Sequence, residues 1–543
     1  MKKRFFGKAA CIGAALLLVS TAVYAGGARA GTARPTTLEF LAPSPVSQVN
    51  DFDAVLNEVY RQTDSTLNIR INYVFTTFDD IGQKVSLRIA AGEQLDGAFV
   101  AQWTNPNMMQ MISQGLLTNL DPYFNNDAYP GLKRYFPAEY LTNNMFTDAK
   151  NENHVYAIPF SNSYGVGANA FYYRKDLADK YGIGEIDSYD KLIRFFEAIK
   201  QYEPGMDPFS FVGSIDSYAR TFLSLYHTLP KTSGHNDIEI PGTGWVIVDD
   251  NGLAYAARHF IPTLDPKFRS LLRGPYRDED PLLAYKLAQE WYQKGYYEKD
   301  ILNERDHEGE FVAGKAASFP RSLDTYPSIL ARFQASLPNA ELGTFVISDT
   351  VRLQTLKTEG VDFKAWNFLA VPSTSRNVDK VMGFMEWIFA DRAHHDLLEY
   401  GIEGRHWVAA GDDKYDYPPG TDPATNYNFS GYLLTWNPLL NRYPVAMPDS
   451  IVNALKRSGD AANFYKRVDA GFTFVTDPVS TELAKMNDLA AYARAIGNGI
   501  PTDLDAEIVR VQRLYEEAGI ERVAAEIERQ FNVFLRSNPY EGQ

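Results

Sequence analysis

The sequence predicts an α/β protein whose N-terminal part contains a mostly parallel sheet. Strand and helix patterns alternate there over residues 37–42, 49–62, 68–75, 78–93 and 97–101. This alternation, with about thirty residues per unit, is typical of right-handed βαβ crossovers. Ligands of such sheets bind beyond the carboxyl ends of the strands. Trp103 and Asn105, which follow the third strand, are therefore candidate ligand contacts.

A second α/β region is expected after a crossing segment rich in Ser, Asn and Gly. A helix is predicted over residues 188–202, with a cap at Asp187 or Ser188, because its apolar residues recur on one face. Asp250–Gly252 lies between two alternating segments and predicts a hairpin. The helical pattern that follows ends at Gly295, a residue type that commonly terminates helices.

The C-terminal region is predicted to be mainly helical. One helix is expected over residues 378–390, and a longer helical pattern begins at a Thr502-x-x-Asp505 cap and is interrupted at Gly519. Beyond this glycine the apolar residues form one stripe, namely Ile520, Val523, Ala524, Ile527, Phe531 and Phe534. Such a stripe is more often packed in a core than offered to a partner.

The first thirty residues have the order of a secretory signal peptide. Lys2, Lys3 and Arg4 precede an apolar run over Ala9–Ala25, and an A-x-A exit ends at Ala30. The run is too short for a membrane span, and no later segment has the roughly 20 apolar residues that a span needs. The mature chain is therefore expected to be exported.

The only cysteine, Cys11, lies at the front of this apolar run, whereas a lipoprotein signal places its cysteine after the run. We therefore predict no lipid anchor, and a mature chain without disulfide, thiol nucleophile or thiolate metal ligand. Removal of the signal also removes five basic residues, so the formal charge changes from −15 to −20. Such a surface repels phosphate backbones and anionic lipids, and no nucleic-acid partner is expected.

The length of 543 residues predicts two or more separate cores. The aromatic share of 13% is high, with 33 Tyr and 33 Phe. Aromatic side chains supply flat apolar faces, so the excess suits either large cores or walls that face a sugar.

Three motifs suggest chemistry but lack the rest of their patterns. GEFVAGKA, residues 309–316, approaches a phosphate-binding loop, but Ala316 replaces the required hydroxyl, and a turn is favoured. GVGANA, residues 165–170, precedes a strand-like segment instead of the helix of a dinucleotide site. His395 and Glu399 could share a helical face, but no third ligand follows, so a solvated helix end is favoured. We therefore predict no cofactor and no metal.

A secreted carbohydrate-active enzyme is the alternative hypothesis. The motifs G-x-S-x-G and H-E-x-x-H are absent, which weakens the serine hydrolase and zinc protease hypotheses. A glycoside hydrolase or polysaccharide lyase has no comparable local signature, because its carboxylates come from distant positions. Glu403 or Asp96 would be the candidate acid, and this alternative stays open at this point.

Several phrases of the sequence together resemble a known family. GKAASFP, YYRKDLADKYGI, SYDKLIRFFEAIK, EWYQKGYYEKDIL and FLAVPSTSRNVDKVMGFMEWIFAD are similar to family 1 extracellular solute-binding proteins of ABC importers. EYGIEGRHWV, GFTFVTDPVSTELAKMNDL and EEAGIERVAAEIERQFNVF resemble the C-terminal region of the LplA-type lipoprotein branch. The resemblance covers essentially the whole mature chain.

The resemblance implies a two-lobed periplasmic-binding-protein fold that closes on its ligand. The expected divisions are a signal peptide at 1–30, a first lobe at 35–158 plus 322–375, a second lobe at 165–318 plus part of 376–543, and an LplA-type C-terminal region at 400–543. Crossing strands near Pro159 and Pro320 would form the hinge.

The resemblance also implies a binding protein instead of an enzyme. It would capture a carbohydrate, most often an oligosaccharide, and hand it to the permease subunits of an ABC importer. LplA-type proteins of Gram-positive cells carry a lipid anchor that this signal lacks, so a soluble periplasmic protein is expected. A protein that opens, closes and docks on a permease is expected to act as a monomer.

The stretch GIEGRHW suits a site that binds its ligand and releases it unchanged. Arg405 can donate to hydroxyls or to a carboxylate, Glu403 can accept from hydroxyls, and Trp407 offers a flat face. An ion pair of Glu403 with Arg405 and a buried Trp407 form the structural alternative.

The remaining candidate ligand contacts belong to the crossing segments or to two Trp-Asn pairs. They are Asn162, Tyr164, Arg321, Asp324, Tyr326, Trp366 and Trp436. For each of them, packing in a core is the alternative. A peptide or polyol ligand also stays open, as does a surface lectin or scaffold that works without a transporter.

Overall fold

The computed structural model describes residues 34–538 apart from residues 45–47, 78–79, 105, 149, 151, 161–168, 212, 214–236, 241–242, 273–276, 304–305, 348–359, 362, 423–424, 430–433, 436 and 438. The predicted signal peptide, Asn105, Asn162, Tyr164 and Trp436 lie outside the described residues. No helix among the described residues has the length and the hydropathy needed to cross a membrane.

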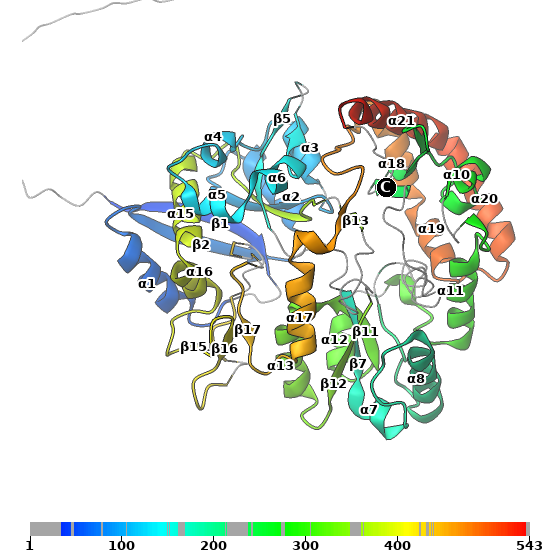
Figure 1. The fold of residues 1–543 in the computed structure, drawn as a ribbon, viewed down its shortest axis with the longest axis horizontal. Coiled ribbons are helices and arrows are strands. Elements are labelled where there is room, and N and C mark those ends of the chain that lie inside the picture. Colours follow the sequence, from blue (N-terminus) through cyan, green and yellow to red (C-terminus); the bar gives the residue numbers. More distant parts are fainter. Residues whose placement is uncertain are drawn as a thin grey trace, which may run out of the picture.

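The first sheet has five strands, in the order β2 (Ile69–Thr76), β1 (Thr36–Pro43), β3 (Gly97–Ala101), β14 (Asn367–Ala370) and β6 (Ala157–Pro159). The three N-terminal strands are parallel, as the sequence predicts, and β14 runs antiparallel to both β3 and β6. Strands β1 and β2 run from the left edge toward the middle of Figure 1. Their carboxyl ends therefore face the other half of the molecule.

Helices that pack around this sheet bury the largest apolar cluster of the described chain. They include α1 (Phe52–Thr63), α2 (Ile81–Ala90), α5 (Pro130–Tyr135), α15 (Val378–Ala390) and α16 (Arg392–Glu399). The helix predicted over residues 378–390 is confirmed. Helices α5 and α15 approach so closely that a Cβ on Gly131 would lie 2.7 Å from the backbone nitrogen of Ala390.

The second sheet is antiparallel and has the order β11 (Ser318–Ser322), β7 (Asn169–Arg174) and β12 (Leu342–Val346). Its helices are α7 (Lys175–Lys180), α8 (Tyr189–Tyr202), α11 (Leu283–Lys294), α12 (His307–Val312), α13 (Tyr326–Ser336) and α17 (Asp449–Ser458). The predicted helix over residues 188–202 is confirmed, with Ser188 at its N-cap position. Gly295 ends α11 in the left-handed conformation, at φ 68°.

A third sheet, β10 (Ala254–Ala256), β9 (Gly244–Val248) and β8 (Asp237–Ile240), shares one core with the C-terminal helices. These are α18 (Ser480–Asp488), α19 (Ala490–Gly497), α20 (Leu504–Ala518) and α21 (Ile520–Ser537). The hairpin at Asp250–Gly252 and the break at Gly519 are confirmed. The cap is Asp503, whose side chain accepts from the backbone of Ala506, and not the predicted Thr502.

The predicted apolar stripe of α21 faces this core, and most of its members are buried. Phe534 is partly buried and packs at the edge of the core. The remaining elements are short: α3 (Met108–Ser113), α4 (Asp121–Phe124), α6 (Ala138–Asn143), α10 (Pro266–Leu271), β4 (Phe146–Thr147), β5 (Asn153–His154), β13 (Gly360–Val361), β15 (Val408–Ala409), β16 (Lys414–Asp416), β17 (Tyr443–Pro444) and β18 (Tyr465–Lys466).

These sheets form two lobes, with the first sheet on the left of Figure 1 and the C-terminal helices on the right. The expected lobe boundary at residue 322 does not fit the strand pairing, because β12 joins β7 and α13 packs in the core of the second sheet. Pro320 lies within the edge strand β11, paired with Phe171, and not at a crossing. The chain returns to the first sheet after Val346, and α15 and α16 also belong to the first core.

Candidate ligand-binding site

Two exposed tryptophans lie where strand β3 ends and its antiparallel partner β14 begins. Trp103 follows β3, and Trp366 directly precedes Asn367, the first residue of β14. The side chain of Gln102 donates to the carbonyl of Ala365 at 3.0 Å and holds the two segments together. Trp103 is 43% exposed and Trp366 is 54% exposed. Each indole therefore offers an exposed apolar face near this end of the sheet, on which a ligand can stack.

The indole of Trp103 is held by neighbours on the first sheet. Its Nε1–H donates to Oδ1 of Asn367 at 2.8 Å, and its ring centroid lies 5.8 Å from that of Phe99. Asn367 is 3% exposed, so its amide orients the tryptophan from beneath. A side chain that is already oriented loses less conformational entropy when a ligand binds.

The second sheet carries Arg321 and Asp324 at the end from which the chain crosses toward the first lobe. Ser322, the last residue of β11, lies opposite Asn169, the first residue of β7. Arg321 has a 45% exposed side chain and lies 3.5 Å from Glu308. Its guanidinium therefore keeps donors that are open to solvent.

Asp324 has one carboxylate oxygen that lacks a donor. Its Oδ1 is buried and has no hydrogen-bond partner among the described residues. Burial raises the pKa of Asp324, although Ser322 and Arg321 act in the opposite direction. Buried acceptors are normally satisfied, so this oxygen would gain from a ligand hydroxyl, which can reach it only after the side chain becomes accessible.

Tyr326 and Trp407, two of the predicted ligand contacts, are buried. Tyr326 is 4% exposed and stacks on Tyr172 with ring centroids 6.2 Å apart. Trp407 is also 4% exposed, and its indole N–H donates to the carbonyl of Gly401 at 2.9 Å. Both rings are packed against protein, so neither offers a face to a ligand.

The GIEGRHW loop docks on the start of α1. Arg405 pairs with Asp51, and Nε2–H of His406 donates to the same carboxylate at 2.9 Å. Nδ1 of His406 accepts from the backbone N–H of Ile402 at 2.9 Å. The hydrogen bond from His406 lowers the pKa of Asp51. Arg405 thus pairs with Asp51 and not with Glu403, the partner that the sequence suggested, and Glu403 is exposed.

Asp96, a candidate acid of the alternative enzyme hypothesis, is completely buried. Its Oδ2 accepts from the backbone of Glu39 at 2.9 Å and from Gln94 at 2.8 Å. Its Oδ1 accepts from Ser375 at 2.7 Å and from Asn377 at 3.0 Å. The carboxylate joins segments of the first lobe and accepts four hydrogen bonds, which disfavours a catalytic role for Asp96.

His395 and Glu399 are not at a solvated helix end. His395 is completely buried, and its Nε2 lies 3.1 Å from the carbonyl of Thr435. Glu399 bonds the hydroxyl of the same threonine, and burial raises the pKa of Glu399. The helix end is covered by the segment around Thr435, which sequence spacing could not reveal. The turn predicted within GEFVAGKA is confirmed, since Gly314 follows α12 with φ 74°.

One cluster of potential metal ligands was missed in the sequence. Side-chain ligand atoms of Asp148, Glu152 and His154 lie within 4.8 Å of one another on the β4–β5 hairpin. Nδ1 of His154 lies 2.7 Å from Asp121, and this contact raises the pKa of His154. The neighbouring carboxylates thus favour the protonated form of His154. The three cluster residues lie within residues 148–154, whereas Asp121, which contacts His154, lies 33 positions before it.

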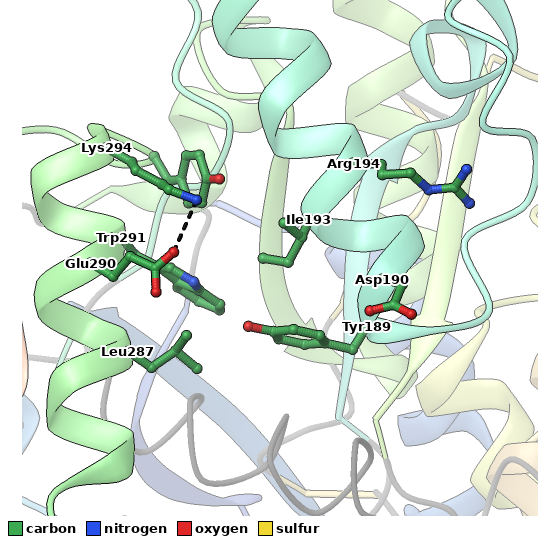
Figure 2. A pocket seen from close by; sticks show the side chains of 9 residues that line it. Tyr189, Asp190, Ile193, Arg194, Leu287, Glu290, Trp291 and Lys294 are labelled. Carbon is green, nitrogen blue, oxygen red and sulfur yellow. Dashed lines mark ion pairs between the residues drawn. The ribbon is translucent and has the colours of Figure 1, made fainter.

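A groove of about 580 Å³ lies between α8 and α11. Figure 2 shows Tyr189 and Ile193 facing Leu287 and Trp291, with Arg194 directed away from the groove. Lys294 pairs with Glu290 at 2.9 Å on its rim. None of the predicted site residues that the structure describes lines this groove. The groove is therefore separate from the two exposed tryptophans and from Asp324.

Comparisons with known proteins agree with this fold. Residues 48–223 match the model of the bacterial extracellular solute-binding protein family, and residues 469–536 match that of a domain of unknown function, DUF3502. No curated protein matches the chain significantly by sequence. The LplA-type assignment of the C-terminal region stays a prediction.

Several solved solute-binding proteins superpose on almost the whole chain. The N-glycan transport solute binding protein NgtS of Streptococcus pneumoniae, in complex with Man1GlcNAc, has a TM-score of 0.66 at 18% identity, over 92% of this chain and 100% of that chain. FusA of S. pneumoniae, in complex with kestose, has a TM-score of 0.57 at 15% identity, over 92% and 100%. An HMO binding ABC-transporter associated protein of Bifidobacterium longum infantis has a TM-score of 0.57 at 14% identity, over 92% and 99%.

The family match covers parts of the first and second sheets, and the superpositions cover almost the whole chain. The matched residues 48–223 include β2, β3 and β7, which belong to the first and second sheets. The superpositions extend the likeness through the C-terminal helices. Residues 48–223 thus match the bacterial extracellular solute-binding protein family, and the chain has the two-lobed fold of solute-binding proteins.

Proposed function

We propose that this protein is the substrate-binding component of an ABC importer, that it captures a carbohydrate between its lobes, and that it delivers the carbohydrate to permease subunits. The observation that carries the proposal is the pair of exposed tryptophans, Trp103 and Trp366, at the sheet end that faces the other lobe. In a fold of this class, that end is where ligands bind.

The tryptophan pair suits the chemistry of a sugar ring. A pyranose or furanose presents C–H groups on its faces and hydroxyls on its rim, so it stacks on an indole while its hydroxyls stay available for hydrogen bonds. Trp103 is already oriented by Asn367, which supports a rigid stacking surface. Each exposed indole can stack on one ring, so two of them near the same end of the sheet favour a ligand with more than one ring.

The second lobe supplies the complementary polar groups. Oδ1 of Asp324 is an acceptor without a donor, and Arg321 has donors open to solvent. Hydroxyls both donate and accept, so a sugar would satisfy both residues. Contacts made by both lobes stabilise a closed arrangement, and ligand binding then shifts the population toward it.

The solved relatives support a carbohydrate as the ligand class. NgtS is described as an N-glycan transport protein, FusA was solved with kestose, and the B. longum infantis protein is described as HMO binding. These proteins share at most 18% identity with this chain, so the particular sugar is left to experiment.

We also infer that the protein returns its ligand unchanged. Asp96 is fully engaged in structural hydrogen bonds, which removes one of the two candidate acids of a carbohydrate-active enzyme. Glu403 lies in a loop that docks on α1. We further propose a soluble, periplasmic, monomeric protein that binds no nucleic acid, in keeping with the signal-like N-terminus and the negative charge.

The proposal is tested with the mature chain, from Gly31 onward, and a panel of mono- and oligosaccharides, uronic-acid oligomers, polyols and short peptides. Thermal shift identifies a ligand class, because a ligand that binds the folded state raises Tm. Calorimetry then gives Kd for wild type, Trp103→Ala and Trp366→Ala. Each substitution is expected to weaken binding at least tenfold, which corresponds to about 1.4 kcal/mol.

The matched control is Tyr202→Ala, because Tyr202 is 54% exposed, like Trp366, but lies at the end of α8. It should leave Kd unchanged. Unchanged affinity in both tryptophan variants would contradict the proposed site. Chromatography of each sugar after incubation separates the two functions, since conversion of a sugar would support the enzyme and refute the binding protein.

A further inference from the structure

The segment that returns the chain to the first sheet has an unusual conformation. Phe363 has φ 54°, one of three described non-glycine residues with positive φ. In this region the Cβ of an L-residue crowds the following carbonyl oxygen, so the conformation persists only where its surroundings enforce it. Phe363 lies between Val346, the end of β12, and Asn367, the start of β14.

Asn144 enforces this conformation. Its Nδ2 donates to the carbonyl of Phe363 at 2.9 Å, and its Oδ1 accepts from the backbone N–H of Ala365 at 2.7 Å. Nδ2 also donates to the carbonyl of Tyr140 at 2.8 Å. Asn144 is completely buried. The side-chain amide of Asn144 therefore forms hydrogen bonds on both sides of the strained residue and connects it to the end of α6.

Helix α6 also contacts the other crossing segment. The hydroxyl of Tyr140 donates to the carbonyl of Phe160 at 3.4 Å, directly after the end of β6. The backbone N–H of Phe160 in turn donates to the carbonyl of Asn367 at 3.0 Å. Tyr140 of α6 and the C-cap residue Asn144 thus contact two of the chain segments that lead from the first sheet to the rest of the molecule.

The same short segment touches the cores of the first and third sheets and one of the two cores beside the second sheet. Phe363 packs against the core of the first sheet and against that of the second sheet. Nζ of Lys364 donates to the carbonyl of Phe472, and Phe472 is part of the core of the third sheet. A change in the backbone at residue 363 would therefore be transmitted to each core.

A buried donor beside this segment lacks a partner. Nδ2 of Asn143 has no hydrogen-bond partner among the described residues, and Asn143 is 1% exposed. Its Oδ1 would lie 3.7 Å from a Cβ on Gly471, in the C-terminal region. An unsatisfied buried donor disfavours the described arrangement and would gain from a shift of the C-terminal region.

We propose that Asn144, Phe363 and Lys364 form a pivot between the lobes, which determines the relative populations of the different lobe arrangements. Asn144 is then a positioning residue for ligand capture. The role in capture rests on the proposed function, whereas the pivot itself is a property of the chain without ligand. If the binding-competent arrangement is a fraction of the population, the apparent Kd is the intrinsic Kd divided by that fraction.

The experiment measures distances between the lobes without ligand. The mature chain is expected to contain no cysteine, so Leu87→Cys on α2 and Val509→Cys on α20 allow specific spin labelling; both side chains are more than half exposed. Pulsed electron paramagnetic resonance gives the distance distribution in this background and in Phe363→Gly, Asn144→Ala and Lys364→Met. Phe363→Gly relieves the strain and keeps the backbone atoms that Asn144 binds.

Each pivot variant is expected to change the ratio of the distance populations by about fivefold or more. The matched control is Asn68→Gly, because Asn68 has φ 48° but lies at the start of β2, within the first lobe. It should reproduce the distribution of the parent. If Asn144→Ala does not fold, Phe363→Gly and Lys364→Met still test the proposed pivot.

Unchanged distributions in the folded pivot variants would overturn the proposal, even if a sugar binds. A changed distribution in a protein that binds no sugar would support the pivot and refute the proposed function. When the distribution changes and a sugar binds, calorimetry should show that each variant alters the apparent Kd of that sugar in proportion to the altered population of the binding-competent arrangement.

Discussion

Replacing Asp96 tests whether its carboxylate is structural or catalytic. The side chain accepts four hydrogen bonds from Glu39, Gln94, Ser375 and Asn377 and is completely buried. In Asp96→Ala these donors lose their acceptor. An unsatisfied buried donor costs about 1–3 kcal/mol, and neighbouring losses are not additive, so the free energy of unfolding should fall by about 3–5 kcal/mol.

The substitution Asp96→Asn is expected to cost less, about 2–3 kcal/mol, because one amide oxygen still accepts while the amide NH₂ faces two donors. Glu93→Ala is the control in the same lobe. Glu93 has a 57% exposed side chain and forms a surface ion pair with Arg88. Glu93→Ala should therefore lower the free energy of unfolding by no more than about 0.5 kcal/mol.

The assay is urea unfolding of the mature chain, followed by circular dichroism and tryptophan fluorescence. Coincidence of the two transitions would show whether a single free energy describes the protein. The reasoning is refuted if Asp96→Ala unfolds within about 0.5 kcal/mol of wild type. A stable variant that had lost an activity toward a sugar would instead support the enzyme hypothesis.

Two further outcomes are expected. Trp407→Ala should lower the free energy of unfolding by about 3–5 kcal/mol, because it empties a buried site, and should leave sugar affinity unchanged in the remaining folded protein; a stable variant with lost affinity would restore Trp407 as a ligand contact. Asp121 raises the pKa of His154 above its unfolded value near 6.5. The resulting stabilisation is complete below that value and is lost as pH rises through the folded pKa. Between pH 6 and pH 9, the free energy of unfolding measured in urea should therefore fall more for wild type than for His154→Gln. An equal fall in both proteins would contradict the ion pair.

The N-terminal elements were predictable because their patterns are local. Alternation and apolar periodicity over β1, α1, β2, α2 and β3 predicted both the elements and their parallel order. Gly519 and the hairpin turn at Asp250–Gly252 were also recognisable, since they depend on backbone conformations that glycine favours. The lobe boundary was not predictable, because the residues of β12 alone do not indicate which sheet this strand joins.

The candidate site was predictable in part. Trp103 was expected from its place after β3, and its exposure agrees with that expectation. Trp366 and Trp407 both stand beside polar residues in the sequence, yet one is exposed and the other is buried against Gly401. The difference arises from distant segments that cover a side chain or leave it open.

The sequence alone determined the local elements, the negative charge, the signal-like N-terminus and the family resemblance, because each of these depends on residues close together in the chain. Tertiary structure decided which residues meet. It brought Asp51 to the GIEGRHW loop across 354 positions, engaged Asp96 with Ser375 across 279, and bracketed Phe363 with Asn144 across 219. Such contacts depend on how packed cores bring distant segments together, and no local pattern encodes them.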